Sequence, residues 1–582
     1  MAKRYRPVNR DQPYLFPPSM REWLPPGHPV WLVITAVDDH LDTSAFHAAR
    51  KTGGAGTAGY DPDMLVTVLV WAYAHQVTSS RRIEQLCHTD VAFRVICGGN
   101  LPDHVTIARF RGAFPGAVAE FFAQVLALCA RLGMGKLGVV ALDGMKIAAS
   151  ASKSANRTGE ALRKLAAETV AAHGQTDAAE DEVFGAGVAG DEVPQDVWSP
   201  RRRAGRIAAA LAGLEGERQA AEAERVKAEK EHLADAAAGR PRSGPPPAGA
   251  AVELARMRVE RARAAQQAKI DAWEARAAAG RRPHGPRPAD PASYVRVREA
   301  QAGLDKAQAR AATAAHPAAG ESSSRPAAGK KKKNSSRTRR PPVRNITDPD
   351  ARLMPVRGGG FIEGYNTQNV TSADGLIIAT ELTQDTTDAP WYEPMLRQAE
   401  TAAAFITAHR PAATSPAATS PAATSPAATS PAASDGEASA SLISLFLADA
   451  GYLSEHNLTI KGPDRLIATG KTRDLEKAAR DGNRADRGRT TPATIAMAAR
   501  LATPEGITAY RQRGHIAETP HGNIKHNMAF RQLSVRGKPK AAAEWAFAVT
   551  VHNLFKAITT GHLTTTALAS LPTPASTQAS PA

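Results

Sequence analysis

The stretch GVVALDGMKI (138–147) decides the fold, because it places Asp143 directly after a run of aliphatic and β-branched residues. Short apolar runs bounded by turn residues are typical of buried strands. A carboxylate at the end of such a strand lies at an edge where water or a metal ion can satisfy its charge. We therefore expect a buried strand that ends at Asp143, with this carboxylate available for chemistry.

Two further acidic residues stand in similarly informative surroundings. Asp449 follows an apolar run in LISLFLADAGY (442–452), and Glu518 lies in YRQRGHIAETPHGNIKHN (510–527). Lys525 follows Glu518 by seven residues, close to two helical turns, so both side chains are expected on one helix face. Carboxylates gathered from separate segments with a lysine nearby are what a two-metal phosphoryl-transfer site requires, and two Asp and one Glu suffice for two Mg²⁺ ions.

Each of these residues also has an ordinary interpretation. A strand-end Asp is more often a turn residue than a ligand, and Glu518 and Lys525 could lie on a solvated helix surface. His521 and His526 flank the same segment, but no paired His or Cys accompanies them. We interpret both histidines as structural or DNA-facing.

The composition points to a polyanionic partner. The 582 residues have a formal net charge of +16, with 43% hydrophobic and only 5% aromatic residues. Excess positive charge favours nucleic acid as a partner, although a solvated basic surface or tail gives the same count. The three cysteines, Cys87, Cys97 and Cys129, have neither CxxC nor zinc-like spacing. Together with the lack of a signal-peptide or membrane-spanning run, this predicts a cytoplasmic protein that uses no membrane.

The chain divides into segments of different composition. Residues 1–134 are expected to be a helical, DNA-binding domain, with Asp61 as an N-cap and basic residues Arg81, Arg82, Arg109 and Arg111 near helix starts. A helix-turn-helix-like DNA reader has this pattern, and so does any small helical bundle with a polar face. Residues 135–155 hold the first catalytic strand, and Ala-rich, charged residues 156–344 are expected to form a helical hairpin or coiled coil that ends in a disordered basic linker.

The remainder, 345–560, is expected to complete the catalytic domain. A hairpin at Asp374-Gly375, a helix over about 389–408, the strand before Asp449, another strand and the helix bearing Glu518 alternate along it. This order predicts an α/β fold with a mixed sheet, with Asp143 and Asp449 on adjacent strands. The PAATS repeats (411–434) are expected to form a flexible loop, and 561–582 a disordered tail.

Basic residues near the expected site are candidates for DNA contact. Residues 471–513 are rich in Lys and Arg, and we expect Arg484 and Arg487 to contact phosphates. Lys525 and Arg513 would hold a DNA strand as a point charge and as a planar fork.

Seven segments together resemble the DDE transposases, closest to the insertion-sequence 1182 family within the insertion-sequence 5 and 4 type group. They leave out the core of 156–344, the PAATS repeats and the tail. The segments are 60–85, 90–111, 139–152, NITDPDARLMP (345–355), GYNTQNVTSADGLIIATELTQDTTD (364–388), LADAGYLSEHNL (447–458), and the series Tyr510, Arg513, Glu518 and Lys525 with IKHNMAFRQLSVRG (524–537).

The resemblance implies a ribonuclease-H-like catalytic domain with Asp143, Asp449 and Glu518 as catalytic and metal-binding triad. Similar enzymes use Mg²⁺ (two ions expected, with Mn²⁺ as a substitute) to cut double-stranded DNA at terminal inverted repeats and to join it to target DNA. It also implies a dimer or larger synaptic complex, nucleoid-associated in a bacterial cell, and DNA-positioning roles for Tyr510, Arg513 and Lys525. This chain reads ETPHG (518–522) where the family usually reads roughly EPVFG.

Two other functions compete with an active transposase. One is a non-catalytic DNA-binding protein derived from a transposase, which the intact triad disfavours. The other is a ribonuclease-H-like nuclease that cuts without joining strands.

Overall fold

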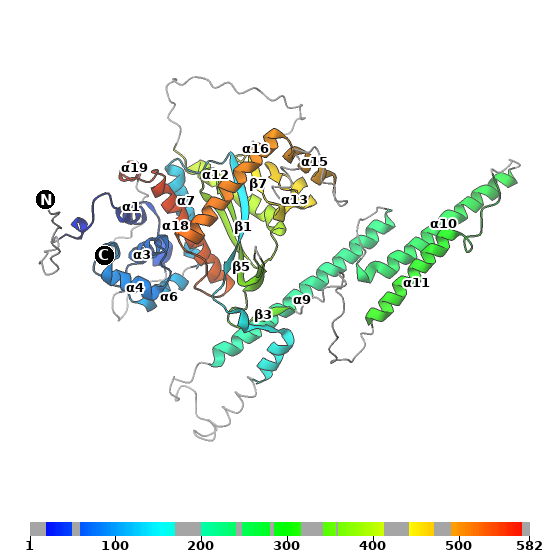
Figure 1. Cartoon of the computed structure of the whole chain (residues 1–582), viewed down its shortest axis with the longest axis horizontal. Helices are drawn as coiled ribbons and strands as arrows, with labels where there is room; N and C mark the ends of the chain where they lie inside the picture. The colour runs from blue at the N-terminus through cyan, green and yellow to red at the C-terminus, as the bar shows by residue number, and fades with distance from the viewer. Residues whose placement is uncertain are drawn as a thin grey trace, which may run out of the picture. The chain divides into compact units, whose positions relative to one another are not determined.

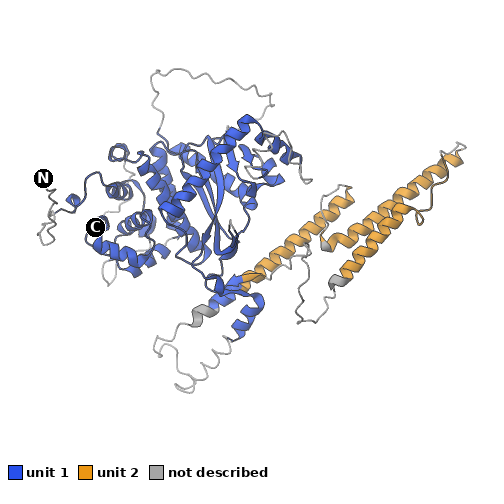
Figure 2. Ribbon diagram, in the orientation of Figure 1, with its two compact units in different colours: residues 1–210, 344–582 blue, residues 211–343 orange. Residues whose placement is uncertain are grey.

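The computed structural model describes residues 19–48, 59–113, 115–168, 200–239, 247–279, 285–315, 342–356, 359–411, 441–470 and 491–572. The chain forms two compact units (Figure 2), residues 1–210 with 344–582 and residues 211–343. The predictions for Arg484, Arg487, most of the basic linker and nearly all of the PAATS repeats lie outside the described residues.

A six-stranded mixed sheet forms the centre of the first unit (Figure 1). Strand β1 (Val139–Ala148) pairs antiparallel with β5 (Phe361–Ser372) and parallel with β7 (Leu445–Ala448), which pairs parallel with β8 (Asp464–Ile467). On its other side β5 pairs with β4 (Arg352–Pro355) and β6 (Ile377–Thr383), both antiparallel. The predicted α/β class with a mixed sheet is confirmed, and β1 and β7 are neighbours as expected.

The hairpin predicted at Asp374-Gly375 joins β5 and β6. Gly375 has a φ of +83°, a left-handed conformation that favours glycine. The carboxylate of Asp374 accepts hydrogen bonds from the backbone N–H groups of Gly135 and Lys136, at 2.8 and 3.0 Å. The turn therefore also fixes the segment that leads into β1.

Two helices pack on the sheet at β6, and a third packs on both of them. Helix α12 (Tyr392–His409) contacts β6 and α7 (Pro115–Arg131), and α18 (Lys538–Thr559) packs on both α7 and β6. Most side chains of α18 are buried, which is typical of a helix in the interior of a domain. The helix expected over about 389–408 is therefore confirmed.

The N-terminal residues are helical, as predicted. They form α1 (Pro29–Thr35), α3 (Pro62–Ala74), α4 (Ser80–Thr89), α5 (Val91–Cys97) and α6 (His104–Ala113) before α7. Asp61 caps α3, since its side chain accepts a hydrogen bond from the backbone N–H of Asp63 at 2.9 Å. Buried residues of these helices belong to the same hydrophobic core as the sheet, and Cys87, Cys97 and Cys129 are buried and unpaired.

The remaining elements are short or lie around the site. They are η1 (Met20–Glu22), η2 (Ala36–His40), α2 (Ser44–His47), η3 (Lys153–Ala155), η5 (Ala248–Ala250), η6 (Ala389–Trp391), η7 (Ala450–Tyr452), α13 (Glu455–Thr459), α15 (Pro492–Leu501), α16 (Pro504–Arg513), η8 (Gly514–Glu518), α17 (Thr519–Gly522) and η9 (Asn523–Asn527). A two-stranded sheet pairs β2 (Asn156–Thr158) with β3 (Val343–Asn345).

The prediction of a disordered tail from residue 561 is wrong for residues 561–572. This segment contains α19 (Thr565–Ser570), capped by the hydroxyl of Thr564. Leu563 and Leu568 are buried in the main core, with exposed fractions of 1% and 2%. Burial of the apolar surface of these two leucines stabilises the packing of this short helix against the protein.

The second unit is helical. Helix α9 (Pro200–Ala237) leads into it, and α10 (Ala251–Ala278) and α11 (Val295–Ala315) pack against each other. Ala255, Val259 and Leu304 form a small buried cluster between these two helices. The long helices predicted within 156–344 are confirmed; the coiled-coil assignment stays a prediction.

Candidate active site

Asp143 lies inside β1, not at its end. The strand continues to Ala148, so the expectation of a strand ending at Asp143 is wrong. The neighbouring strand β7 pairs with β1 only from Val139 to Leu142, whereas β5 pairs with β1 from Val140 to Ala148. Asp143 is therefore the first residue of β1 without a partner on β7. The pairing with β7, and not β1 itself, ends just before this carboxylate.

Asp449 directly follows β7 and caps the short helix η7. One carboxylate oxygen accepts a hydrogen bond from the backbone N–H of Gly451 at 2.8 Å, and the side chain is 40% exposed. Leu142 and Ala448 are partners in the parallel pair. Asp143 and Asp449, the residues that directly follow them, therefore lie at the same level. Burial raises the pKa of Asp449; Arg513 opposes this, and the charges of Asp143 and Asp388 add to it.

Glu518 lies on a helical segment that runs from α16 through η8 and α17 to η9 (Figure 1). Both η8 and η9 are π-helical, a geometry that is rare and frequent at functional sites. Glu518 ends η8, and Lys525 lies within η9. The sequence analysis assumed a regular α-helix here and did not anticipate the two wider turns.

The π-helical turn explains how Arg513 and Glu518 meet. They are five residues apart, a spacing that would put them on different faces of a regular α-helix. A π-helical turn closes with a five-residue spacing, so both side chains point to the same side. Arg513 Nη1 lies 3.8 Å from Glu518 Oε1, and the Glu518 side chain is 65% exposed.

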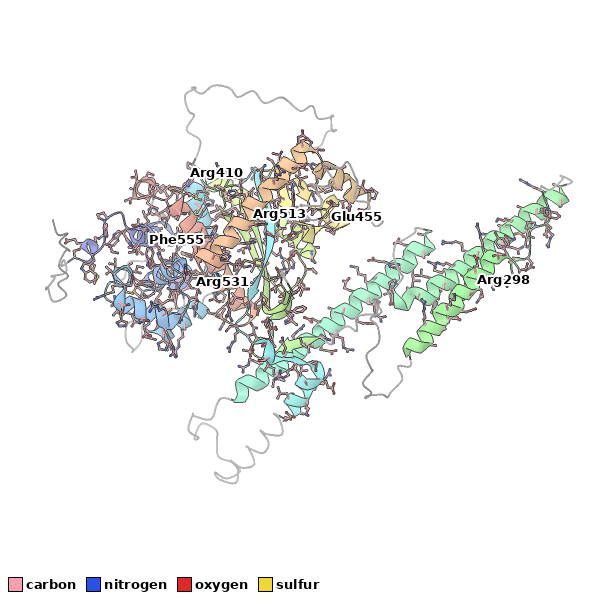
Figure 3. The ribbon with its side chains drawn as sticks, viewed as in Figure 1. Arg298, Arg410, Glu455, Arg513, Arg531 and Phe555 are labelled. Carbon is pink, nitrogen blue, oxygen red and sulfur yellow. The ribbon has the colours of Figure 1, made fainter. Side chains whose placement is uncertain are left out.

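Arg513, labelled in Figure 3, forms ion pairs with all three predicted acidic residues, which that figure does not label. Its Nη2 lies 3.0 Å from Asp143 Oδ1 and 3.7 Å from Asp449 Oδ2. The Arg513 side chain is only 12% exposed, and its Nε has no hydrogen-bond partner among the described residues. Three carboxylates from three separate segments, at residues 143, 449 and 518 of the chain, thus converge on one guanidinium.

Asp388 is a fourth carboxylate at the site, which the sequence analysis missed. One oxygen accepts hydrogen bonds from the side-chain amides of Asn366 and Gln368, at 2.7 and 2.9 Å, and lies 3.5 Å from Lys146 Nζ. A Cβ atom at Gly144 would come within 2.8 Å of Asp388 Oδ1. The glycine after Asp143 therefore makes the space that Asp388 occupies.

His521 and Lys525 complete the surroundings of Asp143. His521 is 8% exposed, and its Nδ1 lies 3.6 Å from Asp143 Oδ2. Burial acts to raise the pKa of Asp143, but the interactions with His521 and Arg513 and the hydrogen bond from the Gly144 N–H outweigh it, so this pKa is lowered. Burial lowers the pKa of Lys525, and the charge of Asp143 opposes this effect.

The ETPHG segment (518–522) is partly buried. Pro520 and His521 are buried within α17. His521 faces Asp143, whereas His526 is exposed. The sequence predicted only that His521 is structural or DNA-facing. In the structure it lies beside Asp143, a candidate metal ligand.

Tyr510 is buried and contacts the strand that leads to Asp449. It is 7% exposed, and its hydroxyl donates a hydrogen bond to the backbone carbonyl of Ala448 at 3.3 Å. This bond fixes the end of β7, directly before Asp449. The predicted contact of Tyr510 with DNA stays a prediction, and the geometry favours an indirect role.

The four N-terminal arginines differ in their surroundings. Arg81 and Arg109 are exposed and line a hollow of about 890 Å³ with hydroxyls of residues 78–80 and with residues 532–534. Neither forms a hydrogen bond or ion pair with another described residue. Arg111 lines the same hollow but donates to the Thr78 carbonyl and to the Ser80 hydroxyl. Arg82 lies outside it and donates to Gln85.

Another group of possible metal ligands lies in the N-terminal helices. Ligand atoms of His47, Asp61 and Asp63 all lie within 4.8 Å of one another. Here Asp61 already caps α3, and Asp63 Oδ1 pairs with His47 Nε2 at 2.9 Å. These contacts account for the group without an ion.

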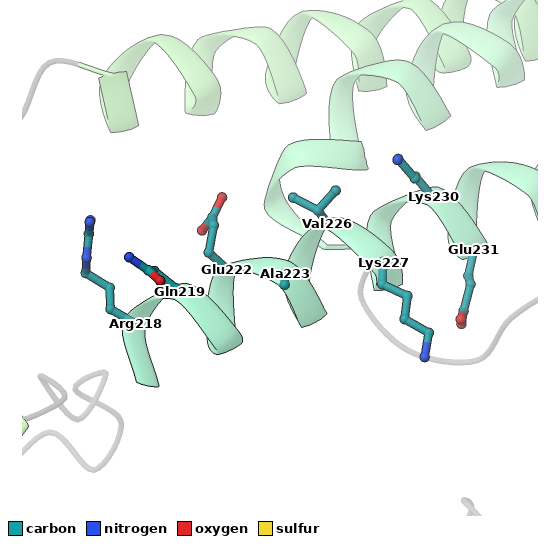
Figure 4. A pocket seen from close by; sticks show the side chains of 8 residues that line it. All are labelled: Arg218, Gln219, Glu222, Ala223, Val226, Lys227, Lys230 and Glu231. Atoms are coloured by element: carbon teal, nitrogen blue, oxygen red, sulfur yellow. The ribbon is translucent and has the colours of Figure 1, made fainter. Parts of the chain in front are cut away.

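The hollow shown in Figure 4 does not qualify as a site. All of its lining residues, from Arg218 to Glu231, belong to one stretch of α9. No side chains from a second element converge on it. It is the surface beside a charged helix.

The acidic group around Arg513 fits a divalent cation. Carboxylate oxygens are the ligands that Mg²⁺ prefers in proteins, and two or three suffice because the ion keeps several waters. Burial raises the pKa of Asp449, and the negative charges of Asp143 and Asp388 add to this effect although Arg513 opposes it. Added positive charge at this place would stabilise the ionised carboxylates.

Comparison with protein families gives two matches. Residues 18–113 match a family described as transposase domain (DUF772), and residues 477–558 match the transposase DDE domain. The second segment contains Arg513, Glu518 and Lys525, whereas Asp143 and Asp449 lie outside both. The two matches indicate a transposase. Comparisons with curated proteins and with solved structures gave no match.

Helix lengths and compositions were also compared with those of membrane spans. Within the described ranges, no single helix is long and apolar enough to cross a membrane. Among the described helices, α6 and α7 have sufficient length and apolar composition for a membrane span when they are taken together. They are bent by 79° relative to each other.

Proposed function

We propose that this protein is a DDE transposase of the insertion-sequence 1182 type, which cuts DNA at the ends of its element and joins the freed ends to target DNA. The observation that carries the proposal is the convergence of Asp143, Asp449 and Glu518 on Arg513. The order β6–β5–β1–β7–β8, with β7 and β8 parallel to β1, supports a ribonuclease-H-like arrangement of the catalytic domain.

In this proposal the three acidic residues hold two Mg²⁺ ions, for which Mn²⁺ substitutes. Bound there, the ions supply activation of water or of a 3′-hydroxyl and stabilisation of the leaving oxygen. The chain's own contribution is to position the ligands: β1 and β7 fix the two aspartates, and the π-helical segment brings Glu518 to them.

Arg513 and Lys525 are proposed to position the DNA strand. Cations bound to the carboxylates would neutralise their charge in place of the guanidinium. Arg513 would then be free to donate to a phosphate oxygen. Its Nε, without a partner among the described residues, is one donor that such a phosphate could use. Lys525 would act as a partly buried point charge on the same segment.

Double-stranded DNA is the proposed partner over a wider surface. The hollow lined by Arg81 and Arg109 offers two exposed guanidinium groups and several hydroxyls, which are typical donors to phosphate oxygens. Arg111 stabilises the hollow from within. Arg484 and Arg487 remain proposed phosphate contacts, and two element ends held together imply a dimer or larger complex.

The proposal is tested with DNA that carries the gene's own flanking sequence. Wild-type protein with Mg²⁺ is expected to give 3′-end cleavage and joined product. Asp449→Ala is expected to abolish both, whereas Glu455→Ala, an exposed carboxylate six residues further on, is the matched control and should leave them unchanged.

The outcomes separate the alternatives. Nicks without joined product, dependent on Asp449, indicate a nuclease that does not transfer strands. Binding without cutting by the wild-type protein indicates a DNA-binding protein derived from a transposase. Cleavage that survives Asp449→Ala contradicts the proposed site.

A further inference from the structure

A row of hydrogen-bonded side chains runs across the sheet behind Asp143. Asn369 on β5 is the direct partner of Asp143 on β1, and Thr380 on β6 is the direct partner of Asn369. Side chains of directly paired residues lie on the same face of a sheet. The three polar side chains therefore point toward the same face, with His521 and Trp545 completing the row.

The distances in this row are those of hydrogen bonds. Trp545 Nε1 lies 2.8 Å from Thr380 Oγ1, which lies 2.6 Å from Asn369 Oδ1. Asn369 Nδ2 lies 2.8 Å from His521 Nε2. Asn369 is fully buried and His521 is 8% exposed, so water competes little for these bonds.

The direction of each bond follows from the donors. An indole nitrogen can only donate, so Thr380 Oγ1 accepts from Trp545 and directs its own proton to Asn369 Oδ1. The Asn369 amide nitrogen then donates to His521 Nε2. A neutral imidazole that accepts at Nε2 carries its proton on Nδ1, the nitrogen that lies 3.6 Å from Asp143 Oδ2.

We propose that His521 is a positioning residue for Asp143, which presents an Nδ1–H to Oδ2 and is held in that orientation by Asn369, Thr380 and Trp545. The other oxygen of Asp143 is fixed by the Gly144 N–H at 3.0 Å and by Arg513 at 3.0 Å. Both oxygens are thereby oriented, and the lone pairs not used in these contacts remain for a cation.

The inference rests on the proposed function, because it treats Asp143 as a ligand of a divalent cation. Groups that orient a metal ligand typically change metal affinity by about 10- to 100-fold when they are removed. The direct test is therefore Mn²⁺ binding to the full chain without DNA, measured by electron paramagnetic resonance. Comparison with the Asp143→Asn variant shows how much of the measured Mn²⁺ binding depends on Asp143.

His521→Phe keeps a ring of similar size but removes both nitrogens. We expect the Asp143-dependent Mn²⁺ affinity to fall about 10- to 100-fold. His521→Asn retains an amide N–H near the position of Nδ1, and we expect it to restore the affinity to within about threefold. His515→Phe changes an exposed histidine of the same helical segment and should leave the affinity unchanged.

A second variant avoids altering the helix that bears Glu518. Thr380→Val keeps the shape of the side chain but removes the hydroxyl that orients the Asn369 amide. The expected loss of Mn²⁺ affinity is smaller, about three- to tenfold, because Asn369 and His521 remain. Thermal melting of each variant separates this loss from unfolding.

The inference is overturned if His521→Phe and His521→Asn lose affinity equally, if neither changes it, or if Asp143→Asn shows that no Mn²⁺ binds at Asp143. It can stand although the proposed function fails: a protein that neither cuts nor joins DNA but shows the expected order of Mn²⁺ affinities supports it. Conversely, DNA joining by the wild-type protein together with an unchanged Mn²⁺ affinity of His521→Phe supports the function and contradicts the inference.

Discussion

The two aspartates and the glutamate of the candidate site are held in contrasting ways. Asp143 is 16% exposed on a central strand, with contacts on both carboxylate oxygens. Glu518 is 65% exposed on a helix interrupted by π-helical turns, and its one ion pair with a described residue is at 3.8 Å. The comparison indicates that the sheet fixes one half of the site before any ligand binds, whereas the helix supplies a half that ligands complete.

The largest expected effects come from the carboxylates themselves. Asp143→Asn and Asp449→Asn should each lower the rate of DNA cleavage roughly 10³-fold, because metal-ion stabilisation of the transition state is worth several kcal/mol. Mn²⁺ binding without DNA should be lost in both variants but should change less than about threefold in Glu518→Gln, since Glu518 is mostly exposed. Equal loss of binding in all three variants would remove the contrast between the two halves.

Arg513 links the two halves, and its removal should destabilise the protein. Arg513→Ala leaves Asp143 buried without its closest positive partner, and this should lower the free energy of unfolding by about 3 kcal/mol and raise the pKa of Asp143. The double variant with Asp143→Asn should recover part of the loss. Denaturant unfolding of the four proteins gives the coupling between the side chains, and strict additivity would contradict the account.

His552 on α18 ties the helix-borne half to the sheet-borne half, and this tie should depend on pH. Asn523 of η9 lies 2.8 Å from His552 Nδ1, and His552 Nε2 lies 3.2 Å from the Gly375 carbonyl. Burial lowers the pKa of His552 from 6.5 to about 4. Since the unfolded chain takes up this proton first, stability is complete above about pH 6.5 and falls by up to about 3 kcal/mol toward pH 4.

Denaturant unfolding at several pH values measures this effect. His552→Gln should be less stable at neutral pH but should lose less stability between pH 6.5 and 4 than the wild type. An unchanged slope would show that other groups cause the acid sensitivity.

The smallest effect concerns DNA contact away from the acidic residues. Reversing the charges of Arg81 and Arg109 should weaken DNA binding about 10- to 100-fold and reduce the steepness of its salt dependence by about two phosphate contacts. Arg82→Glu, outside the hollow, should have a clearly smaller effect. Binding isotherms at several salt concentrations decide this, and equal effects of all three changes would mean that general charge, not the hollow, determines affinity.

The sequence allowed the neighbouring strands β1 and β7 to be predicted, because apolar runs and turn residues carry that information locally; the catalytic role of the acidic residues stays a prediction. It placed Asp143 and Asp449 on adjacent strands; in the structure β1 and β7 are adjacent, with Asp143 within β1 and Asp449 directly after β7. Asp388 could not be found in this way, since it follows a polar stretch without periodicity and is recognised only by its contacts with Asn366, Gln368 and Lys146. The signal that could have drawn attention to it is the pair of glycines beside Asp143 and Asp449, which leave it room.

The role of the helix was also only partly predictable. A seven-residue spacing suggested one face for Glu518 and Lys525, but the contact between Arg513 and Glu518, five residues apart, comes from a π-helical turn that this spacing did not reveal. His521 gained its neighbour through tertiary packing of α17 against β1 and β5, which no local pattern encodes.

The most direct test of the central claim is the position of Mn²⁺ in crystals of the protein, located by its anomalous scattering. The account predicts a peak bonded to both Asp143 and Asp449, with Arg513 displaced from at least one of them. A peak found instead at His47, Asp61 and Asp63, with Arg513 still paired to all three acidic residues, would contradict it.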